Sequence, residues 1–408
     1  MDSDDKPGIG LVPERGPRRT LAIAFFVSMV GNGLYLTGAA LFFTRSAGLS
    51  VSQVGLGMGA ASLAGLLAGV PAGRLADRRG PKETYLVTLA VQAAGVAALL
   101  SVHTFWRFLA VICVAQLANS ASLAARGPLV RGLAGKHSAA YRSYLRAAGN
   151  LAGSCGALAA GVVVQLDTRA AYTALILGTA LTFALAAVVL GRLPRLAPVP
   201  VPPTAGRWTA LRDGPFMTVT LLDSVMSIQG QVLVFALPLW IVAHHEAPRW
   251  LVGVCAVLNT LIVVALQVRA SRGVDSSAGA SRAVRRSGPA FLLGMAVIAA
   301  AGGLPAAPAT ALVLTGVVVH TVGELWHEAA SLELGFALAP EHAQGQYSGL
   351  FGMGRGFANA LAPSLLSLFC LGWGAPGWLT LGGIFVTVGL VMPYAVRWAE
   401  RTRAGDPR

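Results

Sequence analysis

The chain has 408 residues, of which 55% are hydrophobic and only 12% are charged, and its mean hydropathy is +0.66. This composition excludes an ordinary soluble globular protein, in which about 25% of the residues are charged. The net charge of +14 does not indicate a nucleic-acid-binding protein, because the basic residues lie at the ends of apolar runs and are not clustered with aromatic residues. We therefore predict an all-α integral membrane protein.

Apolar runs long enough to cross a membrane follow one another along the chain. They predict twelve transmembrane helices, at roughly residues 20–43, 53–73, 83–102, 105–130, 141–166, 170–190, 214–243, 249–269, 287–305, 308–338, 344–371 and 377–398. The expected organisation is an N-terminal tail at 1–19, a six-helix bundle at 20–190, a Pro-rich linker at 191–213, a second six-helix bundle at 214–398 and a C-terminal tail at 399–408.

The N-terminal tail has acidic residues before its basic cluster and no small-residue cleavage site, so we interpret it as a tail and not as a signal peptide. Lys and Arg residues gather in alternate connections, which predicts that both termini are cytoplasmic. The four cysteines lie inside apolar runs, so we expect free thiols and no zinc site. We expect no cofactor, and a monomer that sits in the cell membrane.

Small residues recur every fourth position in the second predicted helix, at Gly57, Ala61, Gly65, Gly69 and Gly73. On a helix this spacing forms a narrow ridge that allows another backbone to approach closely. The ridge leads into a charged stretch at residues 73–82, which we interpret as a tight connection to the third helix.

This connection carries Gly73, Leu75, Ala76, Asp77, Arg78, Gly80 and Lys82. The pattern resembles the loop signature between the second and third helices of the major facilitator superfamily, although Pro81 replaces a basic residue. The resemblance implies a transporter with two pseudo-symmetric six-helix bundles around a central cavity, and a cytoplasmic loop that holds the outward-open state. The alternative is that the basic residues only mark the cytoplasmic side.

A degenerate copy of the charged connection lies in the second half, where Arg272 and Asp275 repeat the spacing of Arg74 and Asp77. Such a copy is expected of a parallel repeat. A second small-residue surface lies in the eleventh predicted helix, at Gly345, Gly349, Gly352, Gly356 and Ala360. We expect it to slide against the Gly57–Gly73 ridge, with Asp77 binding the amino end of that helix, where the helix dipole favours an anion.

Ionisable residues within membrane helices are costly and mark functional sites by default. In the tenth predicted helix His320, Glu324, His327, Glu328 and Ser331 share one face. Gly323–Glu324, followed by Gly345-x-Tyr347-x-Gly349, resembles the drug:proton antiporter branch of the superfamily. We expect Glu324 or Glu328 to bind the coupled proton; alternatively, Arg355 holds one of them in a structural ion pair, or His320, Glu324 and His327 bind a metal ion.

Asp223 is a further deep acid, about 15 Å along the seventh helix from Asp213. It joins Glu324 and Glu328 as a candidate proton-coupling residue. The candidate substrate-cavity residues are the polar or ionisable side chains of other central positions: Asn32, Tyr35, Gln116, Asn119, Gln229, Gln231, His327 and Arg355. The first helix offers no acid, unlike many proton-coupled exporters of this family.

We predict a secondary active transporter that works by alternating access and exports small apolar or cationic compounds in exchange for protons. An importer or facilitator of a polar nutrient is the alternative within the class, since the amide side chains suit a polar substrate. A non-transporting receptor on the same fold is a third interpretation. We do not expect an enzyme, because the sequence has no nucleophile and base pair, phosphate-binding loop or complete metal motif.

Overall fold

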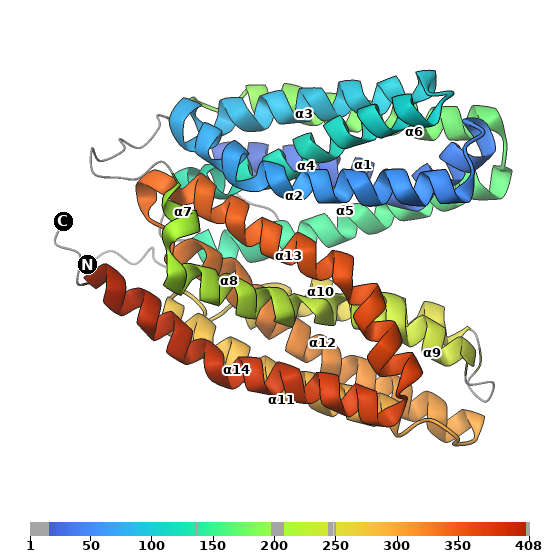
Figure 1. Cartoon of the computed structure of the whole chain (residues 1–408), viewed down its shortest axis with the longest axis vertical. Helices are drawn as coiled ribbons and strands as arrows, with labels where there is room; N and C mark the ends of the chain where they lie inside the picture. The colour runs from blue at the N-terminus through green and yellow to red at the C-terminus, as the bar shows by residue number, and fades with distance from the viewer. Residues whose placement is uncertain (1–15, 135–137, 197–207, 244–247, 249, 405–408) are drawn as a thin grey trace. The chain divides into compact units, whose positions relative to one another are not determined.

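The computed structural model describes residues 16–134, 138–196, 208–243, 248 and 250–404. Most of the predicted N-terminal tail, the last four residues of the predicted C-terminal tail and the middle of the predicted linker lie outside these residues. Within them the regular elements are helices (Figure 1). The helices are α1 (Pro17–Leu41), α2 (Val51–Arg79), α3 (Pro81–Ala98), α4 (Phe105–Ala134), α5 (Ser138–Leu166), α6 (Arg169–Gly191), α7 (Thr209–Arg212), α8 (Gly214–Ser227), α9 (Leu237–Ala243), α10 (Leu251–Ala270), α11 (Ser277–Ala299), α12 (Ala306–Ala337), α13 (Gln344–Leu366) and α14 (Ala375–Ala404).

Ten helical segments of the described chain are long and apolar enough to cross a membrane by length and composition. The segment that begins as α8 and ends as α9 counts as one of them. The more polar α11 and α13 bring the long helical segments to the predicted twelve. The predicted class, an all-α integral membrane protein, is therefore confirmed.

The chain divides into two compact units. The first comprises Met1–Gly65 and Arg78–Pro198, and the second comprises Leu66–Asp77 and Val199–Arg408. The carboxyl-terminal half of α2 therefore belongs to the second unit. The predicted boundaries at 190 and 214 stay predictions.

Within the first unit α1 packs against α5 and α6, and α3 packs against α4 and α6. Glycine makes the α1–α5 contact possible, because a Cβ on Gly33 would lie 2.1 Å from the carbonyl oxygen of Gly153. Between α3 and α4 the buried Ser122 hydroxyl donates to Thr88 Oγ1 (2.8 Å) and accepts from Gln92 Nε2 (2.6 Å). Such paired polar groups join helices that both carry apolar surfaces.

Within the second unit α11 packs against α12 and α14, and α8 packs against α13 and α14. The segment after α8 is irregular: a 3₁₀ turn at Ile228–Gln231 and a π-helical turn at Val232–Ala236 precede α9. The candidate cavity residues Gln229 and Gln231 therefore lie in the 3₁₀ turn and not on a continuous α-helix with Asp223.

Two boundaries differ from the prediction for a physical reason. Helix α2 continues through the predicted loop to Arg79, since residues 74–79 include good helix formers and no Pro, and the chain turns only at Gly80. Gly80 has φ +101°, a backbone conformation that favours glycine. Helix α11 begins at Ser277 and not near residue 287, because the Ser276 hydroxyl caps it by accepting from Gly279 N (3.1 Å).

The predicted ridge of α2 does not pack as one surface. A Cβ on Gly57 would meet Phe108 of α4, and one on Gly65 would meet Gln116 of α4. Gly69 and Gly73 lie instead against α13, where an added Cβ would meet the backbone of Gly349 and Gly345, respectively. Because an α-helix has 3.6 residues per turn, side chains four positions apart do not lie directly above one another but shift gradually around the helix. The small residues at one end of α2 therefore face a different neighbouring helix from those at the other end.

Candidate functional site

The carboxylate of Asp77 binds the first turn of α13. Its Oδ1 accepts from Gly345 N (2.6 Å) and its Oδ2 from Gln346 N (3.1 Å). These two N–H groups have no intrahelical acceptor, because they belong to the first turn, and the helix dipole also favours an anion there. The structure thus has the contact between Asp77 and this helix start that the sequence led us to expect.

Glycine permits this contact on both helices. A Cβ on Gly73 would lie 1.9 Å from the carbonyl oxygen of Gly345, and a Cβ on Gly345 would lie 2.1 Å from the carbonyl oxygen of Gly73. Any larger residue at either position would push the two backbones apart. The side chain of Asp77 is too short to follow such a displacement.

The other predicted gating residues lie elsewhere. Arg78 is exposed, as are Arg272 and Asp275. Lys82 is buried, and its ammonium group donates to the carbonyl oxygens of Gly191 (3.0 Å) and Leu193 at the end of α6. Lys82 therefore binds within the first unit, where a cation favourably meets the last carbonyls of a helix.

A second polar cluster, which the sequence analysis missed, supports the start of α13. Asp213 caps α8 by accepting from Phe216 N (2.9 Å). Its other carboxylate oxygen accepts from the Tyr347 hydroxyl (2.7 Å) and from Arg403 Nη2 of α14 (2.8 Å). The sequence does carry a signal for the cap, because an acid one residue before the Gly-Pro start of a helix favours capping. It carries none for the partners Tyr347 and Arg403, which are distant along the chain.

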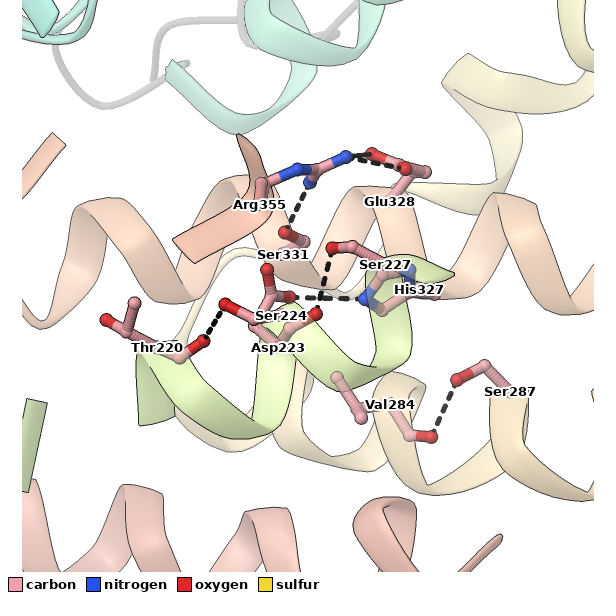
Figure 2. Close-up of polar contacts among 10 residues, drawn as sticks. All are labelled: Thr220, Asp223, Ser224, Ser227, Val284, Ser287, His327, Glu328, Ser331 and Arg355. Carbon is pink, nitrogen blue, oxygen red and sulfur yellow. Dashed lines mark hydrogen bonds and ion pairs between the residues drawn. The ribbon is translucent and has the colours of Figure 1, made fainter. Parts of the chain in front are cut away.

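The polar face of α12 contacts three different helices. His327 Nε2 lies 3.2 Å from Asp223 Oδ1 of α8, and both side chains are almost fully buried. Beside this pair Arg355 of α13 donates twice to the Glu328 carboxylate (2.8 and 3.0 Å) and once to Ser331 Oγ (2.7 Å) (Figure 2). His327 and Glu328 of this face thus bind different partners, whereas Glu328 and Ser331 share Arg355.

Glu324, the third candidate acid, faces α10. Its Oε2 accepts from Asn259 Nδ2 (2.9 Å), which also lies 3.0 Å from Thr321 Oγ1. Glu324 is only half-buried, whereas Asp223 and Glu328 are buried. The three acids therefore occupy three different environments: one beside a histidine, one in an ion pair and one beside an amide.

The candidate cavity residues of the first half, Asn32, Tyr35, Gln116 and Asn119, lie on α1 and α4 of the first unit and are half-buried. In the second unit Gln229 is buried, and both polar atoms of its side chain lack a hydrogen-bond partner in the described chain. Gln231 is half-buried. The described residues hold no group of three or more His, Cys, Asp or Glu side chains placed to bind a metal ion.

A family model and curated relatives both match most of this chain. The model of the Major Facilitator Superfamily matches residues 21–363. The multidrug resistance protein MdtH of Klebsiella pneumoniae (strain 342) is 26% identical over 346 residues, which cover 83% of this chain and 80% of that protein.

Solved structures share the fold at low identity. The human organic anion transporter MFSD10 aligns with a TM-score of 0.66 at 16% identity and covers 93% of this chain and 99% of its own. A bacterial homologue of the iron transporter ferroportin, in its outward-facing state, aligns with a TM-score of 0.72 at 14% identity, covering 95% of this chain and 100% of its own.

Proposed function

This chain belongs to the Major Facilitator Superfamily and is a membrane transporter rather than an enzyme, and we propose that it exports small apolar or cationic compounds in exchange for protons. The substrate class rests on the similarity to a multidrug resistance protein. The proton coupling rests on the environment of Asp223. Both termini are cytoplasmic in this proposal, as the distribution of Lys and Arg favours.

Asp223 is the residue on which the proposed proton coupling depends. Its side chain is about 1% exposed, and its Oδ2 has no hydrogen-bond partner among the described residues. Ionisable groups that are buried inside a membrane protein are costly, and they mark functional sites by default. His327 lies beside the other oxygen, and an imidazole can exchange a proton with a neighbouring carboxylate.

The other two acids have surroundings that favour other roles. Both carboxylate oxygens of Glu328 accept from Arg355 Nη2, and charge-assisted hydrogen bonds of this kind are among the stronger ones in proteins. This favours the structural ion pair that we considered for Arg355. Glu324, half-buried beside Asn259, suits the recognition of a cationic substrate group more than the binding of a proton.

The contact between Asp77 and α13 is the proposed latch of the transport cycle. Alternating access requires a contact that forms in one state and breaks in another. Two hydrogen bonds to one carboxylate form and break together, so they suit a two-state contact. We propose that this latch holds the outward-open state, as the family resemblance implies.

A growth test in an efflux-deficient bacterial host addresses the substrate class and the proton site together. The host expresses the parent chain, Asp223→Asn or Glu328→Gln and is challenged with a panel of cationic dyes and apolar antibiotics. We expect resistance from the parent, its loss in Asp223→Asn, and a milder loss in Glu328→Gln that follows the protein level. Equal resistance from the parent and Asp223→Asn would refute the assignment of Asp223.

Import or facilitated transport of a polar nutrient is the second candidate. The half-buried Asn32, Gln116 and Asn119 favour it, because amide groups suit hydroxyl-rich substrates. Uptake of radiolabelled sugars and nucleosides by the same cells separates the two. Accumulation of a polar solute that depends on Asn119, together with no resistance to any toxic compound, would favour import and overturn export.

A further inference from the structure

Several buried polar side chains of the second unit carry atoms without a hydrogen-bond partner in the described chain, and four of them are the most deeply buried around Asp223 and the histidines of α12. They are Asp223 (Oδ2), Gln229 (Nε2 and Oε1), His320 (Nδ1) and His327 (Nδ1), and none is more than 1% exposed. Buried polar groups are almost always hydrogen-bonded to protein or to ordered water. Ordered water is therefore a candidate partner for these four side chains.

The four side chains belong to neighbouring positions of the fold. His320 and His327 lie seven residues apart on α12, which places them on one face, about 10 Å apart along the helix. The ring of Phe291 of α11 lies against both imidazoles, with centroid distances of 4.9 Å to His320 and 6.3 Å to His327. The carbonyl oxygen of Gln229 lies 3.4 Å from His320 Nε2.

These contacts determine which nitrogen of each imidazole carries the proton. A carbonyl oxygen only accepts, so His320 Nε2 must donate to Gln229 and its Nδ1 is a bare acceptor when the ring is neutral. When Asp223 is ionised and His327 is neutral, His327 Nε2 donates to Asp223 Oδ1 and its Nδ1 is likewise a bare acceptor. Both histidines thus present a proton-accepting atom that no described residue satisfies.

We propose that ordered water joins the Nδ1 atoms of His327 and His320 to the Gln229 amide, and that His327 relays protons from this water to Asp223. An O–H bond of a protonated water (H₃O⁺) on this path breaks, and its proton forms an N–H bond at His327 Nδ1, which leaves a neutral water molecule. The N–H bond at Nε2 then breaks, and its proton forms an O–H bond on Asp223 Oδ1. His327 ends neutral with its proton on Nδ1, Asp223 ends protonated, and rotation or the reverse transfer resets the pair.

His320 has a different part in this path. Its Nε2 faces a backbone carbonyl, which cannot take over a proton, so His320 binds and releases a proton only through Nδ1. It therefore orients the water and does not relay. Phe291 packs against both rings and adds no polar group to the path.

The charged groups near the relay come from two helices. Arg355 of α13 interacts electrostatically with Asp223 and with Glu328 of α12. From α11 the described contact is the uncharged ring of Phe291, and from the 3₁₀ turn it is the Gln229 carbonyl.

The relay rests on the proposed proton coupling, so the test separates the two. Purified protein is reconstituted in liposomes, and proton-driven transport of a cationic dye is compared with dye counterflow, which needs no net proton movement. His327→Gln keeps a donor for Asp223 but cannot pass a proton through its side chain. We expect the ratio of proton-driven transport to counterflow to fall at least tenfold, and the slowing of the parent in D₂O to disappear.

Ser287→Ala is the matched control, because the Ser287 hydroxyl is buried and, within the described chain, donates to the Val284 carbonyl (2.7 Å) on its own helix (Figure 2). It should keep the ratio of the parent. An unchanged ratio in His327→Gln, with coupling lost in Asp223→Asn, would overturn the relay alone. An equal fall of both fluxes would overturn it too, in favour of a structural role for His327. An unchanged ratio in Asp223→Asn would overturn the proposed proton site as well.

Discussion

Replacing Gly73 by Ala should break the latch between Asp77 and α13 without changing any polar group. The added Cβ would lie 1.9 Å from the Gly345 carbonyl oxygen and 2.2 Å from its carbonyl carbon. Both atoms belong to the backbone of α13, so no side chain can turn away. Relief to an ordinary contact of 3.4 Å requires the two helices to separate by about 1.5 Å.

That separation carries the hydrogen bonds of Asp77, now 2.6 and 3.1 Å long, beyond the range in which they contribute. Hydrogen bonds to a charged group each contribute about 1.5–3 kcal/mol. Losing both therefore disfavours the latched state by about 3–6 kcal/mol, which is at least about a hundredfold in its equilibrium with the open state.

Hydrogen–deuterium exchange measures this directly, because the amides of Gly345 and Gln346 are protected by Asp77 and not by a helical partner. We expect these two amides to exchange about a hundredfold faster in Gly73→Ala, with transport reduced in parallel. Gly352→Ala is the matched control, since this residue lies on α13 with nothing within 4 Å of the added Cβ. Unchanged protection at Gly345 and Gln346 in Gly73→Ala would refute the latch.

Three further variants test the described contacts. Gly69→Leu should abolish transport but not membrane insertion, because even a Cβ there would lie 2.6 Å from the Gly349 carbonyl oxygen; full transport by an inserted variant contradicts the close packing. Arg355→Met should lower the free energy of unfolding by about 3–5 kcal/mol, since it leaves Glu328 buried without its ion pair. Thermal melts in detergent measure this loss. The stability should recover when Glu328→Leu is added to the same variant. Tyr347→Phe should cost about 1 kcal/mol of stability through its lost hydrogen bond to Asp213, and an unchanged melting temperature would show that this bond contributes nothing.

The helix positions were predictable from the sequence because apolar length is a strong and local signal. The residues at which the helices end were less predictable from the sequence. Helix α2 continues to Arg79 because nothing before Gly80 terminates it, and a charged sequence is compatible with a helix end as well as with a loop. The helix start at Ser277 depends on a single capping hydroxyl, a signal that the run of arginines obscured.

At the candidate site, too, the sequence predicted what depends on single residues but not which residues far apart in the chain contact one another. The sequence identified Asp223, Glu328, His327 and Arg355 as isolated ionisable residues, since each is costly in a membrane. It did not determine that Arg355 pairs with Glu328 and His327 with Asp223. Those pairings depend on how α8, α12 and α13 are rotated about their axes, which spacing within one helix does not specify.

Coupling of transport to protons through Asp223 is tested most directly by a pH jump across proteoliposomes. With an external pH indicator and a cationic dye as substrate, the parent chain should release protons only when the dye is present, in proportion to the dye transported. Asp223→Asn should transport dye by counterflow without releasing protons. Dye-dependent proton release of equal size in Asp223→Asn, or dye transport by the parent with no proton movement, would contradict coupling through this residue.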